Sequence, residues 1–400
     1  MALDSRTRRA ARRPSSRARY RLRRLITLLV AAVLVAAGAN YFLGQDPVLG
    51  NPKAPILLAW TRDDLLPELA EAAREAEGIG AVATARNGVG WLNSWGPDGA
   101  TRSAPSGFQV PVEVLVVVPQ DYSVFVPEEH RSAFQGLAEG GALLGATGAT
   151  FRGIESTGSL TFGRTTIPVT GVVPDDLVAS HEVVLSLDTA SRLGIDDLKY
   201  VLLELERGTS QEEAEQELRG MLPEGARLGF RAPGEAPVFR PGGTILPQST
   251  IKKQFGEFAG RRGSGRSIVI DPEWVQENTS NFTIPLLGTA RCHNKVIPQI
   301  RGAFQAVVDE GLSNLVRRRD FGGCLAPRFL NSDPHSGLSH HSWGIAFDFN
   351  VASNPYGAEP TMDPRLVSLL EEWGFTWGGR WVVPDGMHFE YLKDAKSGGS

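Results

Sequence analysis

The chain has 400 residues, of which 42% are hydrophobic and 22% are charged. This composition allows two globular domains with ordinary cores and excludes a disordered chain. The net charge of -4 is unevenly divided, because residues 1–24 hold ten Arg and one Asp, whereas the remainder holds 31 basic and 44 acidic residues. Basic residues gather only in this N-terminal tail, so we expect no nucleic-acid partner, which would need a basic patch on a folded face.

The N-terminal tail is followed by a hydrophobic segment at residues 25–43, which is apolar apart from Thr27 and Asn40. A helix of this length spans roughly 28 Å, close to the hydrocarbon thickness of a bilayer. Arginines before it predict a single-pass anchor with residues 1–24 in the cytoplasm and the later domains outside the cell membrane. The alternative is a cleaved signal peptide with cleavage at Ala37-Gly38-Ala39, which would give a secreted protein. Both interpretations export the rest of the chain.

Residues 50–245 carry the signals of a separate extracytoplasmic α/β or α+β domain. Apolar runs predict strands and helical spacing predicts helices, which interleave as 56–60 (strand), 63–76 (helix), 112–118, 165–173 and 183–187 (strands) and 210–222 (helix). No catalytic pattern is found there, and its role is left as a spacer or a module for an envelope protein partner. The stretch 171–187 faintly resembles extracytoplasmic domains of bacterial permease-type export proteins, which assigns no residue a role. Residues 246–284, which begin Gly- and Arg-rich, are expected to be a linker.

Near the C-terminus, residues 345–350 show the period-2 alternation of a strand with one buried face. Large apolar side chains alternate with small or polar ones, among them Ala346 and Asp348. The small side chain of Ala346 leaves a hollow beside the carboxylate. Gly344 interrupts the strand before it, and its conformational freedom would allow His341 to turn from a loop onto the side of Asp348.

A second predicted strand, near residues 388–391, carries a further histidine and further carboxylates. His388 and Glu390 share one face of this strand, and Asp385 stands three residues ahead of His388 on a Pro/Gly turn. Two histidines and one aspartate suit tetrahedral zinc with an open fourth position. Peptide hydrolysis also needs a carboxylate that accepts the proton of the attacking water, and Asp385 is the best-placed candidate.

These two stretches together resemble a known signature. The pattern Ser339-x-His341-x-x-Gly344-x-Ala346-x-Asp348-x-Asn350, followed by Asp385-x-x-His388-Phe, is similar to that of the zinc D-alanyl-D-alanine carboxypeptidases and L-alanyl-D-glutamate endopeptidases. This VanY-like family shares its fold group with lysostaphin and the hedgehog signalling domain. The resemblance covers residues 285–392 and implies an α+β zinc peptidase domain with a small antiparallel sheet and flanking helices.

The resemblance also implies roles for single residues. It makes His341, Asp348 and His388 the zinc ligands and Asp385 the catalytic carboxylate, and it places Arg328 where the family holds substrate or the developing oxyanion. Ser339 and Glu390 are predicted to contact substrate. For Ser339 the alternative is a turn hydroxyl, and for Glu390 it is a partner of His388.

The chain's two cysteines, Cys292 and Cys324, both lie in this C-terminal domain. In an oxidising compartment such a pair predicts one disulfide that closes a loop of about 30 residues. Relatives of the family often carry cysteines at these places. Ligation of zinc by cysteine is the alternative, which we discount because three ligands are already assigned.

The sequence therefore predicts a membrane-anchored, extracytoplasmic zinc metallopeptidase that hydrolyses peptidoglycan stem peptides, as a D-Ala-D-Ala carboxypeptidase or an L-Ala-D-Glu endopeptidase. The alternative is a non-catalytic binding or assembly module of the cell envelope on the same fold. The acidic middle domain would then recruit the partner.

Overall fold

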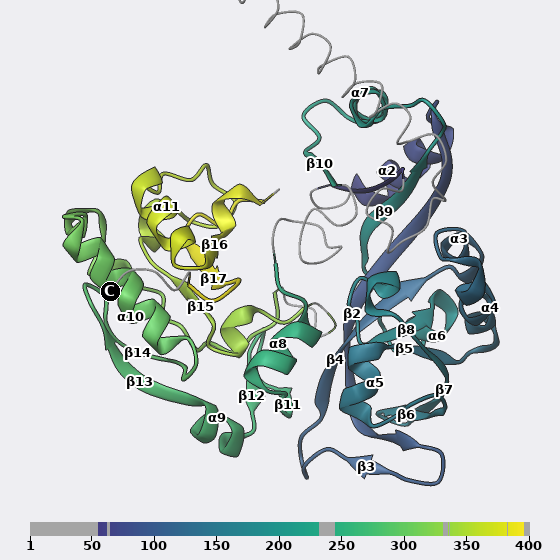
Figure 1. Cartoon of the computed structure of the whole chain (residues 1–400), viewed down its shortest axis with the longest axis horizontal. Helices are drawn as coiled ribbons and strands as arrows, with labels where there is room; N and C mark the ends of the chain where they lie inside the picture. Colours follow the sequence, from purple (N-terminus) through teal and green to yellow (C-terminus); the bar gives the residue numbers. More distant parts are fainter. Residues whose placement is uncertain are drawn as a thin grey trace, which may run out of the picture. The chain divides into compact units, whose positions relative to one another are not determined.

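The computed structural model describes residues 55–61, 65–231, 245–330, 335, 337–381 and 383–395 (Figure 1). These residues all belong to one compact unit, residues 47–400. The predicted anchor at 25–43 and the predicted tail at 1–24 lie outside the described residues, as do residues 396–400 of the tail predicted at 393–400. Within the described ranges, no helix combines the length and the apolar composition needed to cross a membrane.

A large mixed sheet occupies the N-terminal part of the described chain. Its strands pair in the order β10-β1-β9-β2-β4-β8-β5-β7-β6. Their bounds are β1 Ile56–Thr61, β2 Ile79–Pro97, β4 Val110–Val117, β5 Ala142–Gly145, β6 Gly158–Phe162, β7 Thr165–Val173, β8 Val183–Ser186, β9 Leu198–Leu205 and β10 Leu228–Arg231, and β3 Arg102–Ser103 pairs with β2. The mixed α+β class agrees with the sequence prediction.

The long strand β2 connects the two halves of this sheet. Its first half pairs with β9, and its second half pairs with β4 on one side and β6 on the other. The pairing of β6 back onto β2 closes β2, β4, β8, β5, β7 and β6 into a ring of strands. The ring is filled by its own cluster of apolar side chains, including Val112, Val114 and Leu144, each fully buried.

Helices cover the remaining apolar surface of the sheet. The helices are α2 Leu66–Glu75, α3 Pro119–Ser123, α4 Glu128–Gly136, α5 Ala146–Arg152, α6 Leu187–Ser191 and α7 Gln211–Met221. A capping box at Ser210 and Glu213 opens α7, because the hydroxyl of Ser210 accepts from the Glu213 N–H and the Glu213 carboxylate accepts from the Ser210 N–H. Helices α2 and α7 bury Leu69 and Leu218 in the cluster under β1 and β9.

The region predicted as a linker, residues 246–284, is instead folded. It contains α8 Gln248–Phe255, β11 Gly260–Arg262, β12 Ile268–Ile270, α9 Pro272–Asn278 and β13 Thr279–Ile284. Ile251 and Phe258 are almost fully buried in the same apolar cluster as the C-terminal strands. The linker prediction was therefore wrong, because large apolar residues spaced between the glycines and arginines give these short elements a buried face.

The C-terminal part packs short helices and strands around this cluster. Its elements are β14 Gly288–His293, α10 Ile297–Asp309, β15 Ala346–Asp348, α11 Pro364–Glu372, β16 Phe375–Trp377 and β17 His388–Tyr391. Helix α11 begins at a capped end, since the carboxylate of Asp363 accepts from the Arg365 N–H and Pro364 occupies the first helical position. The small antiparallel sheet expected here forms in the order β15-β17-β16.

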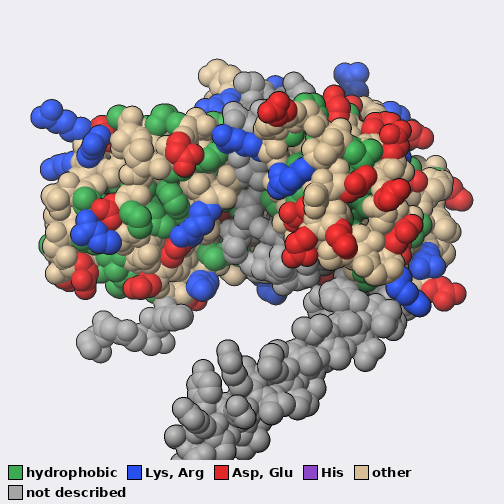
Figure 2. Space-filling view, turned by 90° about the horizontal axis from the view of Figure 1, so that it is seen from above, with side chains coloured by type: hydrophobic (Ala, Val, Ile, Leu, Met, Phe, Trp, Pro, Cys, Tyr) green, Lys and Arg blue, Asp and Glu red, His purple; other side chains and the backbone are tan. Residues whose placement is uncertain are grey.

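The surface of the N-terminal part is acidic around α2 and α7. In Figure 2, which views the molecule from above, Asp and Glu side chains gather over the region where Figure 1 places these helices. An open hollow there is lined by five glutamates, namely Glu75, Glu77, Glu206, Glu213 and Glu217. This arrangement agrees with the negative charge that the sequence assigns to the exported part of the chain.

Candidate metal centre

Strand pairing brings the two polar stretches of the C-terminal part together. In the antiparallel register of β15 and β17, Asp348 lies opposite His388 and Ala346 lies opposite Glu390. Phe347 and Phe389 form the opposite face and stack in the core, with ring centroids 5.9 Å apart. The alternation predicted from the sequence is confirmed, and the small Ala346 leaves room beside the two polar residues.

A turn brings His341 onto this polar face. His340–Ser342 forms a short 3-10 turn, and Gly344 follows with φ of 68°, in the left-handed region that glycine tolerates. A Cβ at residue 344 would come within 3.0 Å of the His293 N atom, so a larger side chain would also collide. Gly344 therefore separates the turn at His340–Ser342 from strand β15, as expected, and lets His341 face Asp348.

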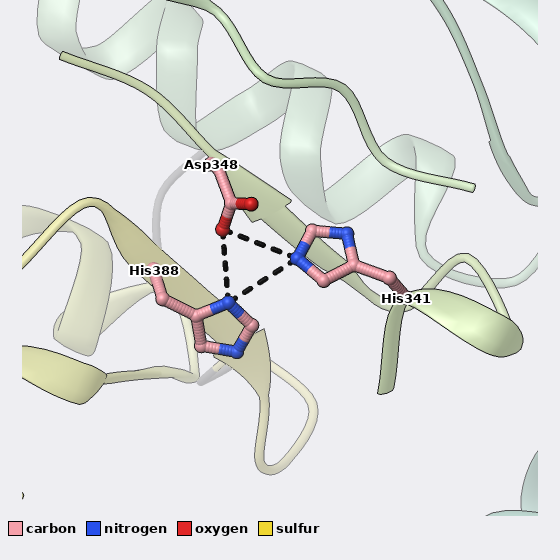
Figure 3. A group of neighbouring side chains, drawn as sticks. All are labelled: His341, Asp348 and His388. Carbon is pink, nitrogen blue, oxygen red and sulfur yellow. Dashed lines mark hydrogen bonds and ion pairs between the residues drawn. The ribbon is translucent and has the colours of Figure 1, made fainter. Parts of the chain in front are cut away.

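Three possible ligand atoms converge from these elements. His341 Nε2 lies 3.1 Å from Asp348 Oδ1 and 3.2 Å from His388 Nδ1, and His388 Nδ1 lies 2.9 Å from Asp348 Oδ1. Figure 3 shows the three side chains pointing toward one another from β15, β17 and the preceding turn. Ligand atoms around tetrahedral zinc are separated by about 3.3 Å when each lies about 2.0–2.1 Å from the metal. The group thus has the composition and spacing of a metal site.

Hydrogen bonds on the outer side of each ring orient these atoms. His341 Nδ1 donates to the Cys324 carbonyl at 2.8 Å, and His388 Nε2 donates to Glu390 Oε2 at 3.1 Å. With their outer protons engaged, both rings can direct a lone pair inward, toward the Asp348 carboxylate. Three acceptors face one another, which is the arrangement a bound cation stabilises.

Burial and mutual contacts shift the pKa values of all three side chains. Burial lowers the pKa of His341, and its contact with Asp348 offsets this only in part. Burial also acts to lower the pKa of His388, but hydrogen bonds with Asp348 and Glu390 outweigh it and raise the pKa to about 10. Burial acts to raise the pKa of Asp348, yet its contacts with both imidazoles hold that pKa well below its usual range. A divalent cation would take the place of the inward proton on His388.

Asp385 lies beside the cluster on the turn that precedes β17. Its N–H donates to the Gly378 carbonyl at 2.9 Å, and its own carbonyl accepts from His388 N–H at 3.1 Å. Its Oδ1 is buried without a hydrogen-bond partner among the described residues. Burial raises the pKa of Asp385, the charge of His388 lowers it, and the charge of Asp348 raises it again. A half-buried carboxylate with a free oxygen and a raised pKa is suited to accept a proton from a small molecule.

Arg328 reaches the same site from the segment that precedes β15, and its predicted role in holding substrate stays a prediction. Its Nη2 lies 3.6 Å from Asp348 Oδ2, on the side of that carboxylate away from the histidines. Burial lowers the pKa of Arg328, and the negative charges of Asp348 and Asp385 act against this. The structure therefore places a cation beside both the three converging side chains and Asp385, where it can pair with an anionic group of a bound molecule.

Ser339 and Glu390 make contacts inside the protein. The hydroxyl of Ser339 accepts from His341 N–H and caps the 3-10 turn, which is the role of a turn hydroxyl. Glu390 Oε2, beside its bond to His388, lies 2.8 Å from His340 Nδ1. Their predicted contacts with substrate stay predictions. The contact of the Cys324 carbonyl with His341 was missed, because a backbone carbonyl has no sequence signature.

The predicted disulfide between Cys292 and Cys324 is present, with a Cα separation of 5.3 Å. Because the Cys324 carbonyl orients His341, the disulfide also anchors a ligand. Replacing both cysteines with Ala is expected to lower the free energy of unfolding by about 3–4 kcal/mol, the entropy of a loop of this length. Urea denaturation of the wild type and the variant, each with zinc and with a chelator, would measure this loss. An unchanged unfolding midpoint under both conditions would contradict the expectation.

Comparison with known proteins supports a peptidase relationship for the last part of the chain. The sequence profile of a family described as D-alanyl-D-alanine carboxypeptidase matches residues 332–391, which include the three converging side chains and Asp385. No curated protein matches the chain. The match and the geometry agree on the same strands, so the C-terminal part is similar to a peptidase of this family.

Two solved structures share a distant likeness with the chain. The periplasmic region of MacB from Actinobacillus actinomycetemcomitans covers 46% of this chain and 90% of its own, at 10% identity and a TM-score of 0.32. The extracellular domain of YknZ, a noncanonic ABC-type transporter from Gram-positive bacteria, covers 40% of this chain and 88% of its own, at 10% identity and a TM-score of 0.26. At this level of similarity neither structure assigns a role to any residue.

Proposed function

We propose that the protein is an extracytoplasmic zinc metallopeptidase that hydrolyses peptidoglycan stem peptides, most directly as a D-Ala-D-Ala carboxypeptidase. The observation that carries this proposal is the convergence of His341 Nε2, Asp348 Oδ1 and His388 Nδ1 beside the unpartnered carboxylate of Asp385. The family match over the same residues supports a peptidase. The disulfide supports an oxidising, extracytoplasmic location.

In this mechanism the three ligand residues would hold zinc, which supplies a Lewis acid for the scissile carbonyl and an acidified water. Asp385 accepts the proton of the attacking water at its free Oδ1 and returns it to the leaving amine. Arg328, beside Asp348, pairs with the substrate carboxylate or with the developing oxyanion. Glu390 and the Cys324 carbonyl keep the two imidazoles in the required tautomers.

We also propose that residues 25–43 anchor the protein in the cell membrane. This anchor would tether the peptidase to the outer side of the cell membrane, next to the peptidoglycan that supplies its substrate. The same geometry serves an internal L-Ala-D-Glu cut if the substrate lies across the site rather than ending in it.

The proposal is tested by digesting purified peptidoglycan and a synthetic pentapeptide with residues 45–400, with and without a zinc chelator. Mass spectrometry should show loss of one terminal D-Ala that the chelator abolishes and added zinc restores. An internal cut would assign the endopeptidase specificity instead. Absence of cleavage by protein shown to contain one zinc would overturn the proposal.

A non-catalytic module of the cell envelope is the second candidate. The acidic hollow between α2 and α7 favours it, since five glutamates on one surface suit a basic partner. A demetallated protein that binds such a partner at full affinity would support this candidate. Hydrolysis that depends on zinc would count against it.

A further inference from the structure

An arm of the C-terminal part leads to the proposed active site. The arm consists of Arg328–Leu330, His335 and Gly337–Ser339. The Leu330 N–H donates to the Gly337 carbonyl at 2.8 Å, Phe329 pairs with Leu338, and the Ser339 N–H donates to the Arg328 carbonyl at 3.1 Å. One end of the arm therefore carries Arg328, and the other end continues into the turn that holds His341.

The far end of the arm is fastened to strand β2 of the N-terminal sheet. The Val89 N–H donates to the His335 carbonyl at 2.8 Å, and His335 Nδ1 lies 3.1 Å from the Val89 carbonyl. Gly88 makes this close approach possible, because a Cβ there would lie only 2.7 Å from the His335 oxygen. The pairing resembles the addition of one residue to a sheet edge, and its tight geometry fixes where the arm can lie.

The middle of the arm is also held by β2. The ring of Trp91 packs edge-on against the ring of Phe329, with centroids 5.9 Å apart. Phe329 is fully buried, and it is the direct neighbour of Arg328 in the chain. Val89 and Trp91 belong to the apolar cluster of the C-terminal part although they lie on a strand of the N-terminal sheet. This strand is therefore part of the core on which the arm rests.

Polar contacts also join the N-terminal sheet to the elements of the C-terminal part. Gln109 and Gly260 exchange two backbone hydrogen bonds of 2.8 Å. Lys252 of α8 donates to both carboxylate oxygens of Glu182 at 2.9 Å, and Arg152 pairs with the same carboxylate. Lys252, Glu182 and Arg152 are at most 2% exposed. Buried charges of this kind tolerate few alternative geometries, so they fix the register of the junction.

We propose that residues 88–91 of β2 are positioning residues for the proposed peptidase: they hold the arm so that Arg328 stays beside the metal ligands. The proposal rests on the proposed function for its catalytic consequence. The N-terminal sheet is then more than a spacer, because it supports the arm that carries Arg328. A partner that displaces β2 would act on the peptidase through Arg328.

The test uses small changes in the full exported chain, residues 45–400. Gly88→Ala adds one methyl group against both the His335 carbonyl oxygen, at 2.7 Å, and the Ile195 Cγ2, at 2.6 Å, so Ile195→Ala/Gly88→Ala is made as well to relieve the second contact. Both are compared with Gly80→Ala, which adds the same group where the nearest atom is the Glu206 Cγ at 3.6 Å. Trp91→Ala is compared with Trp60→Ala, a loss of equal size in the cluster under β1. Hydrogen exchange of peptides covering residues 326–342, zinc content, KM and kcat are measured for each variant.

Deuterium uptake over residues 326–342 is expected to rise in Gly88→Ala and Trp91→Ala but not in their controls. The zinc content should stay at the wild-type value, while kcat/KM falls by on the order of 10- to 100-fold through misplacement of Arg328. Unchanged uptake in both β2 variants would overturn the proposal, as would equal changes in the controls. If uptake rises as expected but the wild-type protein cleaves nothing, the positioning role stands and the peptidase proposal fails.

Discussion

Asp385→Asn is expected to keep its zinc and to lose hydrolysis by on the order of 10²–10⁴-fold, whereas His388→Ala loses both zinc and hydrolysis. Asp385 lies outside the group of converging atoms, and its free oxygen is available for a proton. The amide of Asn cannot accept that proton but fills the same volume. His388 supplies one of three ligand atoms, and its removal also leaves Glu390 without this partner.

Zinc content by elemental analysis and turnover of the pentapeptide would be measured on the same samples. Asp309→Asn, an exposed carboxylate at the end of α10, and His130→Ala, outside the site, are the matched controls and should behave as the wild type. Hydrolysis retained by Asp385→Asn would remove Asp385 as the base. Loss of zinc from the same variant would instead make Asp385 a ligand.

The core of the site could be predicted from the sequence because its information is local. Strand alternation sets Asp348 and His388 on polar faces, and Gly344 supplies the turn, so each ligand's orientation follows from its immediate neighbours. Burial of Phe347 and Phe389 on one face then excludes any pairing of β15 with β17 that is shifted by one residue. Alternation and burial together therefore placed these two ligands opposite each other.

The contacts that support the ligands could not be predicted in this way. The partner of His341 is the backbone carbonyl of Cys324, and a carbonyl has no sequence signature. The support of the Arg328 arm comes from Val89, nearly 250 residues earlier in the chain. The strand order of the large sheet could not be predicted for the same reason. The parallel pairings of β4 with β8 and of β5 with β7 join strands far apart in the chain, and no single stretch of sequence specifies them.

The incorrect linker at residues 246–284 has a different cause. Glycine and arginine near residues 260–266 are typical of a linker, but Ile268, Ile270 and Trp274 around them are buried in the C-terminal cluster. The arginines of β11 are exposed, so the charges lie on the outer side of a short strand pair. Composition averaged over the stretch hid this two-sided pattern.

Hydrolysis by the zinc-loaded protein is expected to fall as the pH is lowered through the pKa of the Asp385 carboxylate. Burial raises this pKa, whereas the charge of His388 and a bound cation act to lower it. A base works only when it is deprotonated, so kcat/KM should drop about tenfold per pH unit below the pKa of Asp385 in the zinc-loaded protein. The profile is measured with zinc content determined at each pH, because protonation of the ligand histidines also releases metal.

Asp385→Asn separates the two causes of the acid limb. Its residual rate should not depend on pH over the range in which the protein keeps its zinc, since the titrating base is gone. The loss of zinc at lower pH should remain in the variant, because His341, Asp348 and His388 are unchanged. An acid limb of the same midpoint in the variant and the wild type, at full zinc content, would show that another group is the base. A limb that disappears with the carboxylate would assign the acid limb, and the proton transfer, to Asp385.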